Sequence, residues 1–83
     1  MPEITRFEGI IIKMFYKPKE HEPSHIHALY GENVGLVNIK TMEMIEGDLP
    51  AKALTLVQAW LAKHQDDLLD MWKNQAIRKL PPL

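Results

Sequence analysis

The 83-residue sequence contains no cysteine. Disulfide bonds, cysteine metal ligands and thiolate catalysis are therefore excluded, and the natural setting is a reducing compartment. A domain of this length buries only about 60% of the surface that its unfolded chain exposes. A metal ion or a second subunit is the remaining means of reinforcing so small a core.

The sequence also lacks a long apolar run and an excess of charge of one sign. Its longest strongly apolar stretch, over 10–12, is too short to cross a bilayer, and its first residues do not resemble a signal peptide. We therefore expect a cytoplasmic protein without a membrane partner. The formal net charge of −1 does not indicate a dedicated nucleic-acid-binding protein, although contact with nucleic acid stays open.

Signatures of two common enzyme classes are missing as well. The four glycines are dispersed and match neither of the phosphate-binding patterns GxxxxGK[ST] and GxGxxG. The only serine, Ser24, is next to His25, but neighbouring residues on a strand point to opposite faces. A nucleotide-binding loop and a serine nucleophile are therefore not indicated.

Alternating apolar residues predict strands in the first half of the chain. Over 10–16 both faces of an extended segment are mostly apolar, which is typical of a central strand. The segment 4–7, ahead of Gly9, forms either a preceding strand or a bulged part of the same one. Further strands are expected over 25–30, 34–39 and 41–45, and their regular spacing predicts an antiparallel meander of three to four strands.

Apolar residues recur at helical spacing in the second half of the chain. Asp48 is a suitable N-cap residue and Pro50 suits the first turn. The helical region is either one long, bent helix or two shorter helices that separate near 63–65. We therefore expect one α+β domain with the helical part packed on the sheet. Its extent is 1–83, with a β-rich part over 4–46, a helical part over 49–77 and an extended tail over 78–83.

Three of the four histidines lie within seven positions, and no other cluster of side chains in the sequence is as well suited to metal binding or catalysis. His25 and His27 are two positions apart on a predicted strand, so their side chains share a face with Cα atoms about 6–7 Å apart. Two such imidazoles can bind one ion, with His21 as a third ligand, and zinc, nickel or iron would suit the site. Additional candidate ligands are Glu20, Glu22 and His64.

Two metal-free roles for the histidines remain open. His25 and His27 are candidate catalytic residues, because imidazoles titrate near neutral pH and can act as acid and base on a phosphodiester. A 2H phosphoesterase would carry two His-X-Ser/Thr motifs, however, and this chain has a single His-Ile-His. Alternatively, the imidazoles line the polar face of the strand as hydrogen-bonded structural residues.

Three segments form a recognisable pattern: Pro-Glu-Ile-Thr-Arg-Phe-Glu-Gly-Ile-Ile-Ile-Lys-Met-Phe at the start, the block His-Glu-Pro-Ser-His-Ile-His-Ala, and Gly-Asp-Leu-Pro before the helix. In these segments the chain resembles the bacterial domain-of-unknown-function family 4160, whose members more often have proline at the position of Ser24. The resemblance implies a small stand-alone prokaryotic protein, often encoded beside another small protein in toxin–antitoxin-like or regulatory gene pairs. It implies no particular activity, substrate or cofactor.

Two functional hypotheses follow. The first is a small binding or regulatory module that forms a homodimer or pairs with a small operon-encoded protein. Apolar residues on both faces of the segment 10–16 favour it. The second is a metal-dependent or histidine-based hydrolase or nuclease, with His25 and His27 as the central pair and His21 as third ligand or orienting group. The first is preferred because small domains without a recognisable catalytic set are more often binders.

Overall fold

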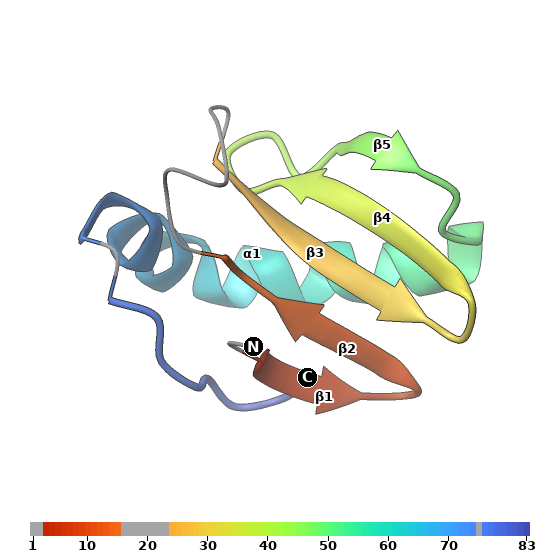
Figure 1. Ribbon diagram of the computed structural model, residues 1–83, viewed down its shortest axis with the longest axis horizontal. Coiled ribbons are helices and arrows are strands. Elements are labelled where there is room, and N and C mark those ends of the chain that lie inside the picture. The colour runs from red at the N-terminus through yellow and green to blue at the C-terminus, as the bar shows by residue number, and fades with distance from the viewer. Residues whose placement is uncertain (1–2, 16–23, 75) are drawn as a thin grey trace.

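The computed structural model describes residues 3–15, 24–74 and 76–83, which form five strands and one helix. The strands are β1 (Glu3–Phe7), β2 (Ile10–Lys13), β3 (His25–Tyr30), β4 (Asn33–Asn38) and β5 (Met44–Gly47), and the helix is α1 (Ala51–Asn74). The strands make one antiparallel sheet in the order β1-β2-β3-β4-β5 (Figure 1). The predicted α+β fold with an antiparallel meander is confirmed, and the described residues contain five strands where three to four were expected.

A two-residue turn at Glu8 and Gly9 separates β1 from β2. The φ angles of the two residues are positive, 48° and 77°, as the tight turns of β-hairpins require. Glycine adopts this backbone conformation without strain from a side chain. The segment ahead of Gly9 is therefore a strand of its own, and a register shift between Glu3 and Thr5 adds a bulge to it.

The turn between β4 and β5 lies where the sequence predicted a strand over 41–45. The Asn38 side-chain oxygen Oδ1 accepts hydrogen bonds from the backbone N–H groups of Lys40 and Thr41, at 2.8 and 3.1 Å. The Met42 N–H donates to the Asn38 carbonyl at 2.7 Å. Because an asparagine side chain competes for backbone donors in this way, the chain turns here and β5 begins only at Met44.

The start of α1 differs from the prediction that Asp48 is its N-cap. Asp48 Oδ1 accepts a hydrogen bond from the Val34 N–H at 3.3 Å, and the Asp48 N–H donates to the Val34 carbonyl at 3.1 Å. The Leu54 N–H donates to the Pro50 carbonyl at 2.9 Å, and the helix begins at Ala51. That prediction is wrong, because Asp48 is still paired with β4 and lies too far upstream to reach the helix end.

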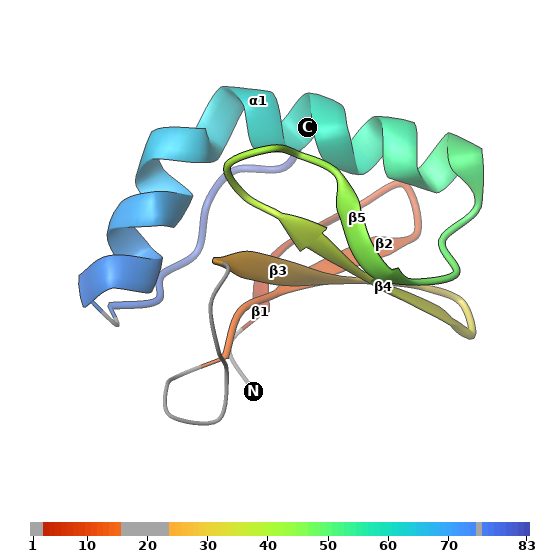
Figure 2. The ribbon, with the colours of Figure 1, turned by 90° about the horizontal axis from the view of Figure 1, so that it is seen from above.

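The helix covers one face of the sheet and bends at His64, whose φ of −121° and ψ of 16° are not helical. The predicted break near 63–65 is therefore a bend within one helix. Beyond the bend, the last turns of α1 descend past the end of the sheet (Figure 2). Gln65 Nε2 donates to the carbonyl oxygens of Ile39 and Lys40, at 2.8 and 2.9 Å, and so ties the helix to the end of β4. No helix of the described chain is long and apolar enough to span a membrane.

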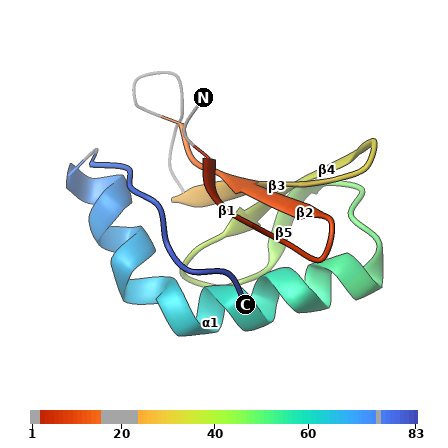
Figure 3. The same ribbon diagram turned by 90° about the horizontal axis from the view of Figure 1, so that it is seen from below.

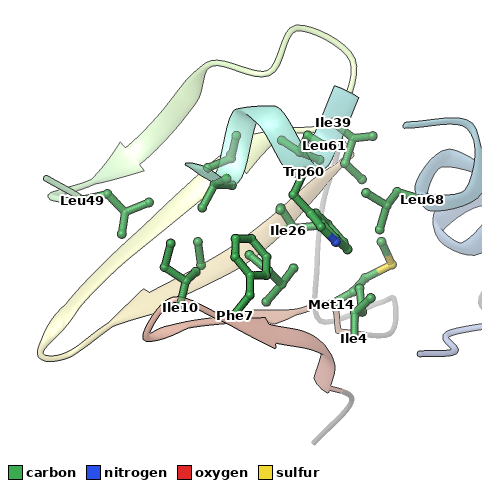
Figure 4. Close-up of a cluster of buried hydrophobic side chains, with 14 of the residues drawn as sticks. Ile4, Phe7, Ile10, Met14, Ile26, Ile39, Leu49, Trp60, Leu61 and Leu68 are labelled. Carbon is green, nitrogen blue, oxygen red and sulfur yellow. The ribbon is translucent and has the colours of Figure 1, made fainter. Parts of the chain in front are cut away.

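The core lies between α1 and the sheet face turned toward it (Figure 4). Its fully buried side chains include Ile4, Ile10, Ile12, Met14, Ile26, Ile39, Trp60, Leu61, Leu68 and Met71. After the helix the tail returns alongside β1 (Figure 3). The Leu80 N–H donates to the Ile4 carbonyl at 3.0 Å, and Trp60 Nε1 donates to the Pro81 carbonyl at 2.8 Å. The tail thus covers the outer edge of β1.

Candidate functional site

The two central histidines lie side by side at the start of β3. His25 and His27 occupy alternate positions on this strand, on the side opposite the core residues Ile26 and Ala28. Their ring centroids are 5.3 Å apart and their planes are inclined by 55°. The predicted strand over 25–30 and the common face of the two imidazoles are therefore confirmed.

Two aromatic side chains flank the imidazole pair. The Trp72 ring lies 5.0 Å from the His25 ring, and the Phe15 ring meets His27 edge-on at 4.6 Å. His25 is consequently 6% exposed, whereas His27 is half-buried. Trp72 reaches this end of the sheet because α1 bends at His64 and its last turns pass beside the start of β3 (Figure 2).

The other predicted metal ligands do not join this pair within the described chain. His21, Glu20 and Glu22 lie outside the described residues. His64 is at the bend of α1, where its ring packs 5.0 Å from the core ring of Trp60. Across residues 3–15, 24–74 and 76–83, no group of three or more histidine, aspartate or glutamate side chains could hold a metal ion. The described residues thus supply two imidazoles to any such site.

Ser24 is enclosed rather than presented to a substrate. Its side chain is 2% exposed, and its carbonyl accepts a hydrogen bond from the Ile39 N–H at 3.1 Å. Within the described part of the chain, the Ser24 hydroxyl has no hydrogen-bond partner. An enclosed hydroxyl that has no hydrogen-bonded base in the described part of the chain lacks the activation that a serine nucleophile requires.

A second feature is the face of the sheet turned away from α1, the open face. Strand register places Ile11, Leu29 and Val34 opposite one another on β2, β3 and β4, and this trio forms the apolar row. Leu36 lies across from His27 in the neighbouring row. None of the four belongs to the core cluster or to the partly buried hydrophobic residues packed against it. Val34 is 41% exposed, whereas Ile11, Leu29 and Leu36 are half-buried.

Charged side chains border the apolar row at its two ends. Arg6 of β1 lies directly across from Ile11 on the neighbouring strand, and Lys13 of β2 lies directly across from His27. On the other side Glu46 of β5 pairs with Leu36, and Asp48 follows beside Val34. The open face is therefore basic toward β2 and acidic toward β5.

One ion pair lies within the basic side. Arg6 Nη2 lies 2.8 Å from Glu3 Oε1, and both side chains reach solvent. The hydrogen bond and the positive charge of the guanidinium lower the pKa of Glu3, and the carboxylate raises the pKa of Arg6. Arg6 and Glu3 offset each other, so Lys13 supplies the net positive charge of this side.

Part of these two features was predicted from the sequence. The common face of His25 and His27 was expected, and so were apolar residues on both faces of the segment 10–16. The extension of the apolar surface to Val34 and Leu36 was missed, although the predicted strand over 34–39 put both residues on one face. No local sequence pattern indicates that Trp72 contacts His25, because this contact depends on the bend of the helix.

Comparison with known proteins identifies a family for this arrangement. No curated protein and no solved structure matches the chain. Residues 9–73 match the family model described as Domain of unknown function (DUF4160). The matched segment contains β2 to β5 and almost all of α1, including the two histidines and the apolar row. The chain therefore belongs to the DUF4160 family, as the resemblance of its histidine block had implied.

Proposed function

We propose that this chain is a small protein-binding module and that the open face of its sheet is the binding surface. The observation that carries the proposal is the apolar row of Ile11, Leu29 and Val34, with Leu36 beside it, on the face turned away from the helix. These side chains contribute nothing to the core between sheet and helix. A partner protein that covers the row and Leu36 would complete the burial of the three half-buried side chains and shield the exposed Val34 from water.

A row of apolar side chains is unusual on a sheet face that is turned to solvent. An antiparallel sheet with a helix on one side normally has polar side chains on the other. Here each of the three central strands contributes an outward apolar residue, and the three are adjacent in the register. A contiguous exposed apolar patch with a polar rim typically marks an interaction site.

The kind of partner follows from the size of the domain and from its family. A core this small gains much from further apolar burial, and a second subunit can supply it. A second copy of the chain and a small protein encoded by the adjacent gene are the two partners under this proposal. In the second case the module would act as one component of a toxin–antitoxin-like or regulatory pair.

Substitution at the centre of the apolar row tests the proposal. Leu29→Glu places a charge in the middle of the surface, so we expect association to be lost. Light scattering over a concentration series would measure self-association, and co-purification after co-expression would measure binding of the neighbouring gene's product. Ala59→Glu, on an exposed position of α1, is the matched control and should leave both unchanged. A wild-type chain that is monomeric at all concentrations and does not retain the neighbouring protein would overturn the proposal.

A second candidate function is a histidine-based metal site or hydrolase. It is favoured by the 5.3 Å separation of the His25 and His27 rings on one strand face. Under this candidate the pair would bind zinc, nickel or iron, with His21 as third ligand or orienting group. Elemental analysis of untagged protein and cleavage assays on a synthetic RNA would test it. Absence of stoichiometric metal, with RNA cleavage unchanged in the His25→Ala/His27→Ala variant, would rule it out.

A further inference from the structure

We infer that the open face binds a second copy of the chain, packed face to face about a two-fold axis parallel to β3. The inference rests on the proposed function, because it requires the open face to be a binding surface. It is carried by the order of apolar and charged side chains from β1 to β5, because this symmetry operation pairs the apolar rows and also brings unlike charges together.

The apolar row is the first part of that order. In the register, Ile11 of β2 and Val34 of β4 lie on either side of Leu29, which is on the central strand. A two-fold axis parallel to β3 and passing over Leu29 lays β2 of one copy over β4 of the other. Leu29 then meets its own counterpart, and Ile11 meets Val34 of the second copy. All three apolar side chains of each copy are covered.

The charges are the second part. Lys13 lies on β2, whereas Glu46 and Asp48 lie on and just after β5. The same axis places the basic side of one copy over the acidic side of the other. Lys13 of each copy then faces the Leu36–Glu46 side of its partner, so that two equivalent favourable contacts form. Opposed patches of unlike charge favour an orientation and exclude others.

The alternative two-fold axis, perpendicular to the strands, does not bring these charges together. When it passes over Leu29, it places each strand over its own counterpart, and Ile11, Leu29 and Val34 each meet themselves. Lys13 and Glu46 lie in the neighbouring row, which this axis carries to the opposite side of the apolar row, so they do not face each other. Strand-parallel symmetry is therefore the arrangement that satisfies both the apolar row and the charges.

The dimensions of the molecule limit the size of the interface. The molecule measures 31 × 24 × 24 Å, and the view down its shortest axis looks onto the sheet (Figure 1). The outline of the whole molecule in this view, of which the sheet fills a part, is comparable to the ~800 Å² that each partner contributes to a standard interface. Two packed sheets lie about 10 Å apart with interdigitating side chains, which would create a second apolar layer between the copies.

Reciprocal charge substitution tests the arrangement. Lys13→Glu alone, and Glu46→Lys alone, each create two like-charge contacts in the homodimer. We expect each to weaken self-association on the order of tenfold in sedimentation experiments. An equimolar mixture of the two variants restores an attractive contact at both positions, so the mixed dimer should form with about the wild-type affinity. Lys52→Glu, on an exposed position of α1, is the charge-matched control and should have no effect.

Circular dichroism and thermal unfolding of each variant would establish that the fold is retained before association is compared. A mixture that associates no more tightly than its components would overturn the inferred arrangement, as would a Lys13→Glu variant that dimerises like wild type. If wild type is monomeric but binds the neighbouring gene's product through Leu29, self-association is refuted and the proposed function stands. If Leu29→Glu changes no association at all, both fail.

Discussion

Trp72 and Phe15 hold the two imidazoles of β3 between them. Trp72 is 4% exposed and its ring lies 5.0 Å from His25, while Phe15 meets His27 edge-on. Aromatic neighbours shield an imidazole from water and restrict its rotation, whatever further role it has. At the scale of single residues, the histidine pair is therefore part of a packed end of the sheet as well as a candidate site.

Truncation of Trp72 tests this packing. Trp72→Ala removes a buried indole and opens a cavity beside His25, so we expect a loss of about 3 kcal/mol in the free energy of unfolding. The ring-current shift of the His25 imidazole protons in the NMR spectrum should disappear together with the indole. Lys73→Ala, at the neighbouring exposed position, should alter neither quantity. An unchanged His25 spectrum in Trp72→Ala would contradict the observed contact.

The ion pair of Arg6 and Glu3 gives a prediction about pH. Because the hydrogen bond from Arg6 lowers the pKa of Glu3 below its ordinary value of 4.5, the folded state binds this proton less readily than the unfolded state. The stabilisation is present above that ordinary value and is lost as the pH falls through the lowered one. Arg6→Gln should therefore raise the pKa of Glu3 toward 4.5 in an NMR titration. A Glu3 titration that is identical in wild type and Arg6→Gln would show that the pair does not form in solution.

Among the elements, the bend in α1 decides what the second half of the helix contacts. Residues before His64 lie over the sheet, and residues after it pass the sheet's end, where Trp72 meets His25. Gln65 holds this geometry through its two hydrogen bonds to the carbonyls of Ile39 and Lys40. The bond to Ile39 is part-buried and the bond to Lys40 is exposed, so the anchor stabilises the helix end mainly through the first.

Removal of the anchor should loosen the end of the helix selectively. Gln65→Ala removes the donor of both bonds, and we expect a loss of about 1 kcal/mol in unfolding free energy, because water can replace the donor at the exposed Lys40 carbonyl. Amide hydrogen exchange over 65–74 should accelerate more than exchange over 51–62. Lys63→Ala, exposed and adjacent to the bend, is the control for a change in helix propensity. Equal acceleration along the whole helix would indicate that Gln65 has no local anchoring role.

For the molecule as a whole, association and stability are linked. If the open faces pair as inferred, folding and dimerisation share one equilibrium, and the thermal midpoint should rise with protein concentration. In Leu29→Glu the midpoint should be independent of concentration, while Ala59→Glu should behave like wild type. Calorimetry over a hundredfold range of concentration measures this. A wild-type midpoint that stays constant over the range would count against self-association.

The sequence by itself determined the features that depend on near neighbours in the chain. Alternation over 25–30 was enough for the strand that carries His25 and His27, because residues two apart on a strand necessarily share a face. The helical spacing of apolar residues and the break near 63–65 were likewise local signals. The predicted ends of strands and helix were less accurate where a side chain forms a hydrogen bond with a distant backbone group, as Asp48 does with Val34.

Only the tertiary structure decided which residues far apart in the chain meet. The packing of Trp72 on His25 depends on the bend of α1 and its anchorage to β4, which no periodicity encodes. The apolar row of Ile11, Leu29 and Val34 depends on the pairing register of three strands, and a shift of one residue would send each side chain to the other face. Sequence pattern assigns faces within an element, whereas the packing of elements determines which of those faces remains uncovered.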